Sequence, residues 1–137
     1  MIRKFFALMI LTVLIALTNT AAAYDYVSYR GHVAGYGWQE PVGDGGVIGT
    51  VGESLQMEAA RIELVGRTQQ YFDVYYRAHV ENYGWLGWAK NGEPAGTAGA
   101  GLRLEALQIL LVDKEDTFET GGDKAAFYQK IVNAPTV

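Results

Sequence analysis

The segment "HVAGYGW", residues 32–38, returns as "HVENYGW", residues 79–85, and this repetition organises the chain. The longer stretches 29–65 and 76–112 align without a gap at the 47-residue offset that separates His32 from His79. An ungapped match of this length indicates a tandem duplication. The identical pairs include Tyr29/Tyr76, Arg30/Arg77, His32/His79, Tyr36/Tyr83, Trp38/Trp85, Gly45/Gly92, Gly49/Gly96, Thr50/Thr97, Gly52/Gly99, Leu55/Leu102, Glu58/Glu105 and Ile62/Ile109.

Each unit has the pattern of short strands joined by tight turns. The stretches "VSYRGHV" (27–33) and "VYYRAHV" (74–80) alternate in polarity and are rich in aromatic and β-branched residues, which predicts a strand in each. Asp44-Gly45 and Asn91-Gly92 are hairpin-turn signals. We therefore expect an all-β fold.

The last segment of each unit is ambiguous between strand and helix. Leu102, Leu104 and Ala106 alternate as in a strand, but Ile109 and Leu111 continue in the opposite phase. A β-bulge near Ala106 would reconcile the two phases. A short helix is the alternative, because Glu, Ala and Leu favour one. We expect the strand.

The size of the units predicts that they share one core. A unit of under about fifty residues rarely buries enough surface to fold alone without a metal or disulfide. We expect one domain over residues 24–112, with repeats at 24–65 and 66–112, in a trefoil-like or prism-like arrangement of two pseudo-symmetric units. The side chains expected to meet in the core are Val33, Leu55, Ile62, Val80, Leu102 and Ile109.

The segment 113–137 falls outside the repeat register. Asp123 is placed to cap a short helix over "KAAFYQKIV" (124–132), so the tail is a candidate helix. A lid over an open edge, a degraded third unit and a loose tail are the alternatives that the sequence leaves open.

The first 23 of the 137 residues predict a secretory signal peptide. Arg3 and Lys4 precede a short apolar run over 5–17, and three alanines, 21–23, offer a cleavage site. We therefore expect a secreted or cell-surface protein. Loss of Arg3 and Lys4 leaves 9 of the 11 basic residues against 15 acidic ones, a net charge of −6. This charge disfavours nucleic acid and anionic lipid as partners, and no second apolar run suggests membrane contact after cleavage.

The repeat resembles the clostridial hydrophobic W family, also called ChW repeats. The first unit reads "YRGHV", "GW", "DG", "GTVG" and "LQMEAARIEL", and the second reads "YRAHV", "GW", "NG", "GTAG" and "LRLEALQILL". Two departures matter. A second Trp three residues after the first is present as Trp88 but is replaced by Pro41 in the first unit, and such repeats often occur in larger groups.

The resemblance implies an exported, all-β module of surface or secreted proteins. It also implies adhesion, or binding of polysaccharide or another extracellular ligand. We accordingly expect extracellular polysaccharide, cell-wall glycan or a surface protein as the partner.

The residue types argue against catalysis. The chain has no Cys, hence no thiol nucleophile or thiolate metal site, and it lacks the common hydrolase, zinc-protease and phosphate-loop motifs. Its only two histidines occupy matched positions, as a repeated structural role would require. We expect no enzyme activity, no cofactor and no metal. A glycosidase that uses Glu58 or Glu105 is the remaining alternative.

The aromatic residues of the repeated frame are the candidate ligand-binding residues. Trp38 and Trp85 either fill the shared core or help to form an exposed platform, on which a sugar could stack. Trp88 is the best candidate for exposure, because Pro41 stands at its matched position. The candidate set is Trp88, Trp85, Tyr83, Trp38 and Tyr36.

The charged residues of the frame are candidate structural pairs. His32 alternates with Arg30 on one strand face. We expect one of these two residues to pair with Glu58, as a His–Glu or an Arg–Glu pair in each unit. A ligand-binding role for the histidines is the alternative. The candidate set is Arg30, His32, Glu58, Arg77, His79 and Glu105.

Two functions from different classes follow. The first is a non-catalytic module that binds glycan or cell wall. The second is a structural module that self-associates or binds a protein, because two units can leave a sheet edge open.

Overall fold

The computed structural model describes residues 24–130 and is all-β, as predicted. The predicted signal peptide, 1–23, and the segment 131–137 lie outside the described residues. The only helical element within 24–130 is a 3-10 turn, η1 (Thr68–Gln70). The strands are β1 (Tyr26–Val33), β2 (Gly37–Trp38), β3 (Met57–Val65), β4 (Phe72–Val80), β5 (Gly84–Trp85), β6 (Ala89–Lys90), β7 (Ala95–Ala98), β8 (Leu104–Asp113) and β9 (Phe127–Gln129).

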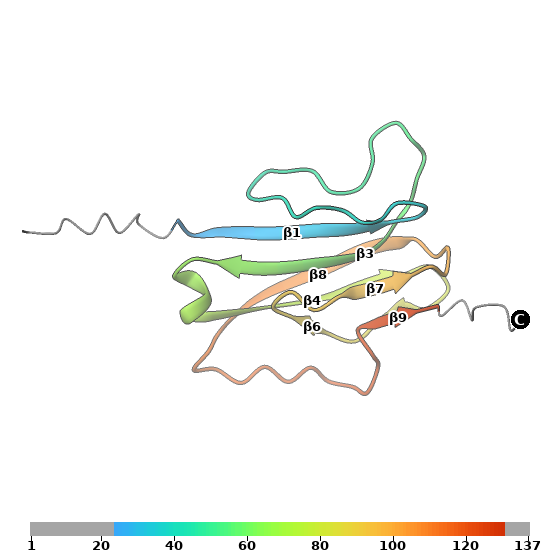
Figure 1. Ribbon diagram of the computed structural model, residues 1–137. Coiled ribbons are helices and arrows are strands. Elements are labelled where there is room, and N and C mark those ends of the chain that lie inside the picture. Colours follow the sequence, from blue (N-terminus) through green and yellow to red (C-terminus); the bar gives the residue numbers. More distant parts are fainter. Residues whose placement is uncertain (1–23, 131–137) are drawn as a thin grey trace, which may run out of the picture.

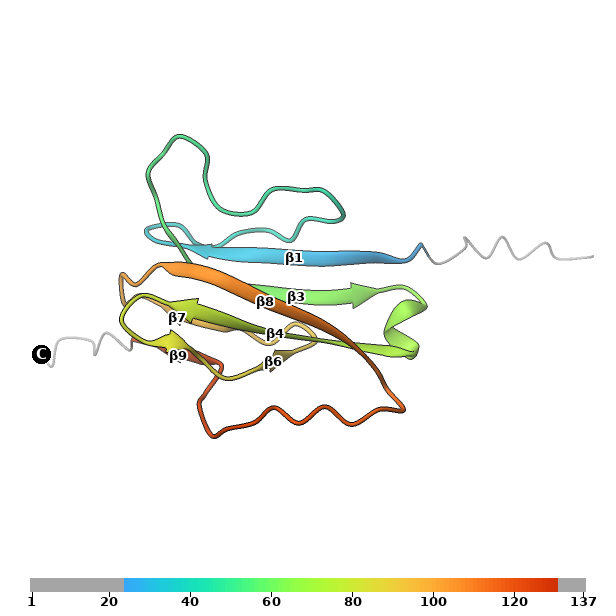
Figure 2. The ribbon, with the colours of Figure 1, turned by 180° about the vertical axis from the view of Figure 1, so that it is seen from behind.

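The strands form two sheets that do not divide cleanly between the repeats. One sheet has the order β2-β1-β3-β7-β9, and in the other β4 pairs with β5, β6 and β8. Every pairing is antiparallel except that of β7 with β9. Strand β7 belongs to the second repeat but pairs with β3 of the first. Figure 1 shows β1 and β3 side by side, and Figure 2 shows β8 running obliquely on the other side of the molecule.

The segments that were ambiguous between strand and helix are strands, and each contains a bulge. In β3 the register with β1 shifts so that His32 faces Ala59 while Val33 faces Met57. In β8 the register with β4 shifts in the same way, from Ala106 to Leu104. The bulge predicted near Ala106 is therefore confirmed. It leaves one glutamate in each repeat, Glu58 and Glu105, without a strand partner.

The buried core draws on both repeats. Ile62 of the first repeat lies in one cluster with Val74, Tyr76 and Val80 of the second. Val33 is also fully buried, and Leu102 packs against the cluster. The expectation was wrong for Leu55 and Ile109, whose exposed fractions are 36% and 56%. Strand β8, which carries Ile109, pairs only with β4 among the described strands, so part of its apolar surface stays uncovered.

The tail contains a strand where a helix was predicted. Phe127 to Gln129 form β9, which runs parallel to β7. The backbone amide of Gly96 donates to Ala126 O, and that of Lys130 donates to Ala98 O. Hydrogen bonds to the edge of β7 thus replace those of the predicted helix. No helix in the described part of the chain is long and apolar enough to cross a membrane.

Candidate functional site

The repeated frame forms a tight corner in which His and Trp lie opposite each other. His32 pairs with Trp38 across β1 and β2, and His79 pairs with Trp85 across β4 and β5. In both corners the rings meet edge to face with centroids 5.3 Å apart. The glycine before each Trp has a positive φ, +80° at Gly37 and +69° at Gly84, which glycine adopts without strain.

Each frame histidine lies against the glutamate of the adjacent bulge. His32 Nδ1 is 3.0 Å from Glu58 Oε2, off the line of a hydrogen bond, and His79 Nδ1 is 3.1 Å from Glu105 Oε2. The bulge is what turns each carboxylate toward its histidine. The structure thus brings together the two His–Glu pairs, rather than Arg–Glu pairs, from the candidate set.

The two glutamates differ in their remaining contacts. Glu58 is 1% exposed, and its carboxylate accepts hydrogen bonds from the backbone amides of Gly99 and Gly101 in the second repeat, at 3.3 and 2.9 Å. The side chain of Glu105 is 34% exposed, and its other close partner is the Arg103 guanidinium at 3.3 Å. Glu58 therefore joins the two repeats, whereas Glu105 faces solvent.

The frame arginines stack on the frame tryptophans. The guanidinium of Arg30 lies 5.7 Å from the ring of Trp38, and that of Arg61 lies 4.7 Å from the same ring. In the second repeat the guanidinium of Arg77 lies over Trp85 at 4.9 Å. Cation–π contacts of this kind hold both groups in place. Neither Trp belongs to the buried core, so the core reading of Trp38 and Trp85 is wrong.

The second repeat adds a pocket beside this stack. Arg77 also lies 4.8 Å from the ring of Trp88, so one guanidinium contacts both indoles. Trp88 is half-buried, because its edge packs on Phe118. Lys124 donates from Nζ to Trp85 O. The pocket has a volume of about 290 Å³ and is lined by Arg77, Trp85, Leu86, Gly87, Trp88, Thr120, Gly121, Gly122 and Lys124.

The remaining aromatic candidates lie apart from this pocket. Tyr36 is exposed and donates from its hydroxyl to Glu53, which raises the pKa of the phenol. Tyr83 stacks on Tyr128 with centroids 5.7 Å apart, and Trp38 contacts Phe127. The five candidates therefore do not form one continuous platform.

Sequence reasoning missed the contribution of the tail. Thr120 and Lys124 line the tryptophan pocket and Phe118 packs on Trp88, yet all three residues lie in the tail beyond the two repeats. Their only sequence signal was their place in the tail, for which a lid over an open edge was one of the alternatives.

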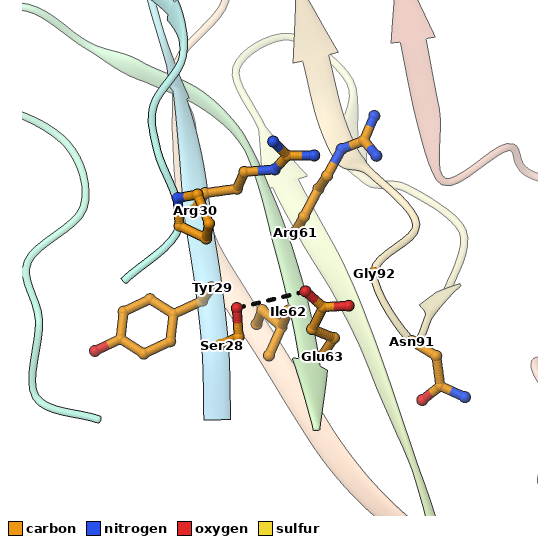
Figure 3. Close-up of a pocket in the computed structure, with 9 residues that line it drawn as sticks. Ser28, Tyr29, Arg30, Arg61, Ile62, Glu63, Asn91 and Gly92 are labelled. Atoms are coloured by element: carbon orange, nitrogen blue, oxygen red, sulfur yellow. Dashed lines mark hydrogen bonds between the residues drawn. The ribbon is translucent and has the colours of Figure 1, made fainter. Parts of the chain in front are cut away.

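A second pocket, of about 330 Å³, opens between β1, β3 and the turn at Asn91 and Gly92. Figure 3 shows the side chains of Arg30 and Arg61 extending on the same side of the two strands. Ser28 donates to Glu63 at 3.4 Å lower in the pocket. The lining of this pocket includes one half-buried ring, Tyr29, whereas the exposed Trp85 and the half-buried Trp88 both line the tryptophan pocket, so the tryptophan pocket is the stronger candidate site.

The described residues hold no group of three or more His, Cys, Asp or Glu side chains that could bind a metal ion.

In the comparisons with known proteins, the family described as Clostridial hydrophobic W matches residues 32–66 and 79–113. No curated protein matches the chain, and no solved structure does.

Proposed function

Since the chain belongs to the clostridial hydrophobic W family, we propose that it is an exported, non-catalytic module that binds extracellular polysaccharide or cell-wall glycan. Its place of action is outside the cell or at the cell surface. The N-terminal signal pattern, 1–23, supports this location.

The observation that carries the proposal is the Trp85–Arg77–Trp88 arrangement. The two indoles and the guanidinium line a pocket of about 290 Å³, a size that suits one or two sugar rings. An indole face packs on the apolar C–H face of a pyranose, and guanidinium N–H groups donate to hydroxyl or carboxylate oxygens. The pocket therefore offers both kinds of contact that a glycan needs.

The divergence between the repeats supports the same site. Trp88 has Pro41 as its counterpart, so the fold does not require an aromatic ring there. The histidines and the bulge glutamates, by contrast, have matched positions and form a matched His–Glu contact in each repeat. Binding is best assigned to the residues that the fold leaves free to vary.

The test is retention of residues 24–137 on insoluble polysaccharides and peptidoglycan. Wild type should be retained on at least one of them, and Trp88→Ala should bind about tenfold more weakly, a loss of about 1.4 kcal/mol. Tyr24→Ala is the control, because it removes an exposed ring that does not line the pocket. Absence of retention on every glycan, or equal loss in both variants, would count against the proposal.

The proposal includes the absence of catalysis. Glu58 is occupied by His32 and by two backbone amides, so its carboxylate is not available to a substrate. Release of reducing sugar that disappears in Glu105→Gln would contradict this part.

A second candidate function is association with another protein. The observation that favours it is the uncovered apolar surface of β8, where Ile109 and Leu111 are each more than half exposed. An exposed strand edge beside apolar side chains is a template for pairing with another chain.

A further inference from the structure

We propose that the free edge of β8 binds a turn-and-strand segment of the G-T-x-G type from a partner protein, as β3 binds β7 within this chain. This inference rests on the second candidate function and specifies its site. It concerns a different surface from the proposed glycan site, because no residue that lines the tryptophan pocket belongs to β8.

The internal junction between the repeats supplies the template. Strand β7 pairs with β3 in the register Ala59 to Gly96 and Ala60 to Ala95. The approach is close: a Cβ on Gly96 would lie 2.4 Å from Glu58 O. The strand therefore needs glycine at this position, and the residue before it, Ala95, is fully buried.

Glu58 completes the junction. Its carboxylate accepts from the amides of Gly99 and Gly101, which both have positive φ, +70° and +69°. A left-handed glycine turn thus directs two N–H groups at one carboxylate. The junction combines a short strand pairing with this carboxylate contact.

Strand β8 has the same position in the second repeat as β3 has in the first, but no described strand pairs with it as β7 pairs with β3. Ala59 is fully buried beneath β7, whereas its counterpart Ala106 is exposed. Ile62 is 6% exposed and its counterpart Ile109 is 56% exposed. Among the described strands β8 pairs only with β4, so its other edge is unpaired along the chain from 24 to 130.

Glu105 stands where the carboxylate contact would form. The bulge presents it beside His79, as Glu58 is presented beside His32. No backbone amide of a turn corresponding to Gly99 and Gly101 reaches it within the described residues. A partner that carries such a turn would place two N–H donors against this carboxylate.

The surface next to this edge is apolar. A cavity of about 460 Å³ opens between the sheets, and apolar side chains from both repeats line it, among them Ile62, Leu107 and Ile109. A partner strand with apolar residues on one face would cover it. β-Augmentation combines these features: backbone pairing at an edge and side-chain contacts on one face.

The small residues of β7 argue for a partner protein rather than a second copy of this chain. The segment of a second copy that corresponds to β7 begins at Ile48, where β7 has Ala95. At the internal junction Ala95 faces Ala60, but on β8 the facing residue is Leu107. A partner with alanine there reproduces the small residue that β7 presents at the internal junction, whereas Ile48 does not.

The test uses a blocked peptide with the sequence of residues 93–103, "EPAGTAGAGLR", as the probe. In an NMR titration of residues 24–137 up to millimolar peptide, the amides of 104–113 should shift and exchange more slowly with solvent. Glu105→Ala should weaken binding about tenfold. The control Glu81→Ala removes another partly exposed partner of Arg103 and should bind as wild type does.

A peptide with alanine at the position of Gly96 should not bind, because its Cβ would meet the β8 backbone. The proposal is overturned if millimolar peptide leaves the β8 amides unchanged, or if Glu81→Ala and Glu105→Ala weaken binding equally. It is also overturned if the chain dimerises by itself and Gly49→Ala abolishes the dimer, since a second copy would then be the occupant.

Discussion

The backbone amide of Gly101 donates a hydrogen bond of 2.9 Å to Glu58 Oε1, and this contact links the bulge of the first repeat to a turn of the second. His32 lies on the other side of the same carboxylate, 3.0 Å away. The Glu58 carboxylate therefore contacts both the frame histidine of the first repeat and a turn of the second repeat.

Removing the Glu58 carboxylate should destabilise the protein far more than removing that of Glu105. Glu58→Ala leaves two turn amides and His32 without a buried partner, so we expect a loss of about 3 kcal/mol in the free energy of unfolding. Glu105→Ala removes exposed ion pairs, and its cost should stay below about 1 kcal/mol. Urea denaturation of both variants measures the difference. Equal losses would refute the distinct roles assigned to the two residues.

Gly49 and Gly96, which begin the two G-T-x-G turns, allow a second comparison between matched positions of the two repeats. A Cβ on Gly96 would lie 2.4 Å from Glu58 O and 2.7 Å from the Cα of Ala59, so Gly96→Ala must separate β7 from β3. A Cβ on Gly49 would meet only the Met57 sulfur, at 3.9 Å. Both positions have positive φ, so each substitution costs about 1 kcal/mol in backbone strain. We expect a total of about 3 kcal/mol or more for Gly96→Ala, measured by thermal denaturation.

The duplication made the local contacts predictable from sequence. Matched residues lie in matched strands, so the His–Glu pairs and the bulges recur at the offset that the alignment shows. Burial could not be predicted in this way. Ile62 and Ile109 have matched positions, yet Ile62 packs in the core cluster and accepts a backbone hydrogen bond from the turn at Gly92, whereas no described strand lies along the other edge of β8.

The tail was unpredictable for a different physical reason. The residues "KAAFYQK" favour a helix locally, and no repeat register indicates what they contact. The free edge of β7 supplies backbone partners at Gly96 and Ala98, and these partners select a strand. Gly87 permits the approach, because a Cβ there would lie 1.8 Å from Lys124 O. The tryptophan pocket depends on this docking.

Asp73 should make stability depend on acidic pH. Burial pushes the pKa of its carboxyl up, but hydrogen bonds from Lys90 and Asn91, with the charge of Lys114, outweigh burial and hold the pKa below 3.8. Because the folded-state pKa is lowered, the stabilisation is present above the unfolded value and is lost as pH falls through the folded one. Asp73→Asn should therefore be about 1 kcal/mol less stable than wild type near neutral pH, with the gap closing below pH 3.8.

Salt provides the control for Asp73. The carboxylate remains partly accessible, so about 1 M NaCl should reduce the neutral-pH gap between wild type and Asp73→Asn. A gap that is constant from acidic to neutral pH would show that the substitution acts through packing and not through charge.

Tyr76 should govern the alkaline limit of stability. Its ring is fully buried and its hydroxyl donates to Glu93 O, and burial raises the pKa of the phenol to about 12. Because the folded pKa lies above the unfolded value of 10.0, the folded state loses stability as pH rises from 10.0 toward 12. Tyr76→Phe should cost about 1 kcal/mol at neutral pH through the lost hydrogen bond, and its stability should fall less steeply above pH 10. Tyr29→Phe is the control for the cost at neutral pH, since the matched hydroxyl donates to Gly46 O. Denaturation curves from pH 10.0 upward measure the slope, and an unchanged slope in Tyr76→Phe would mean that another group sets the alkaline limit.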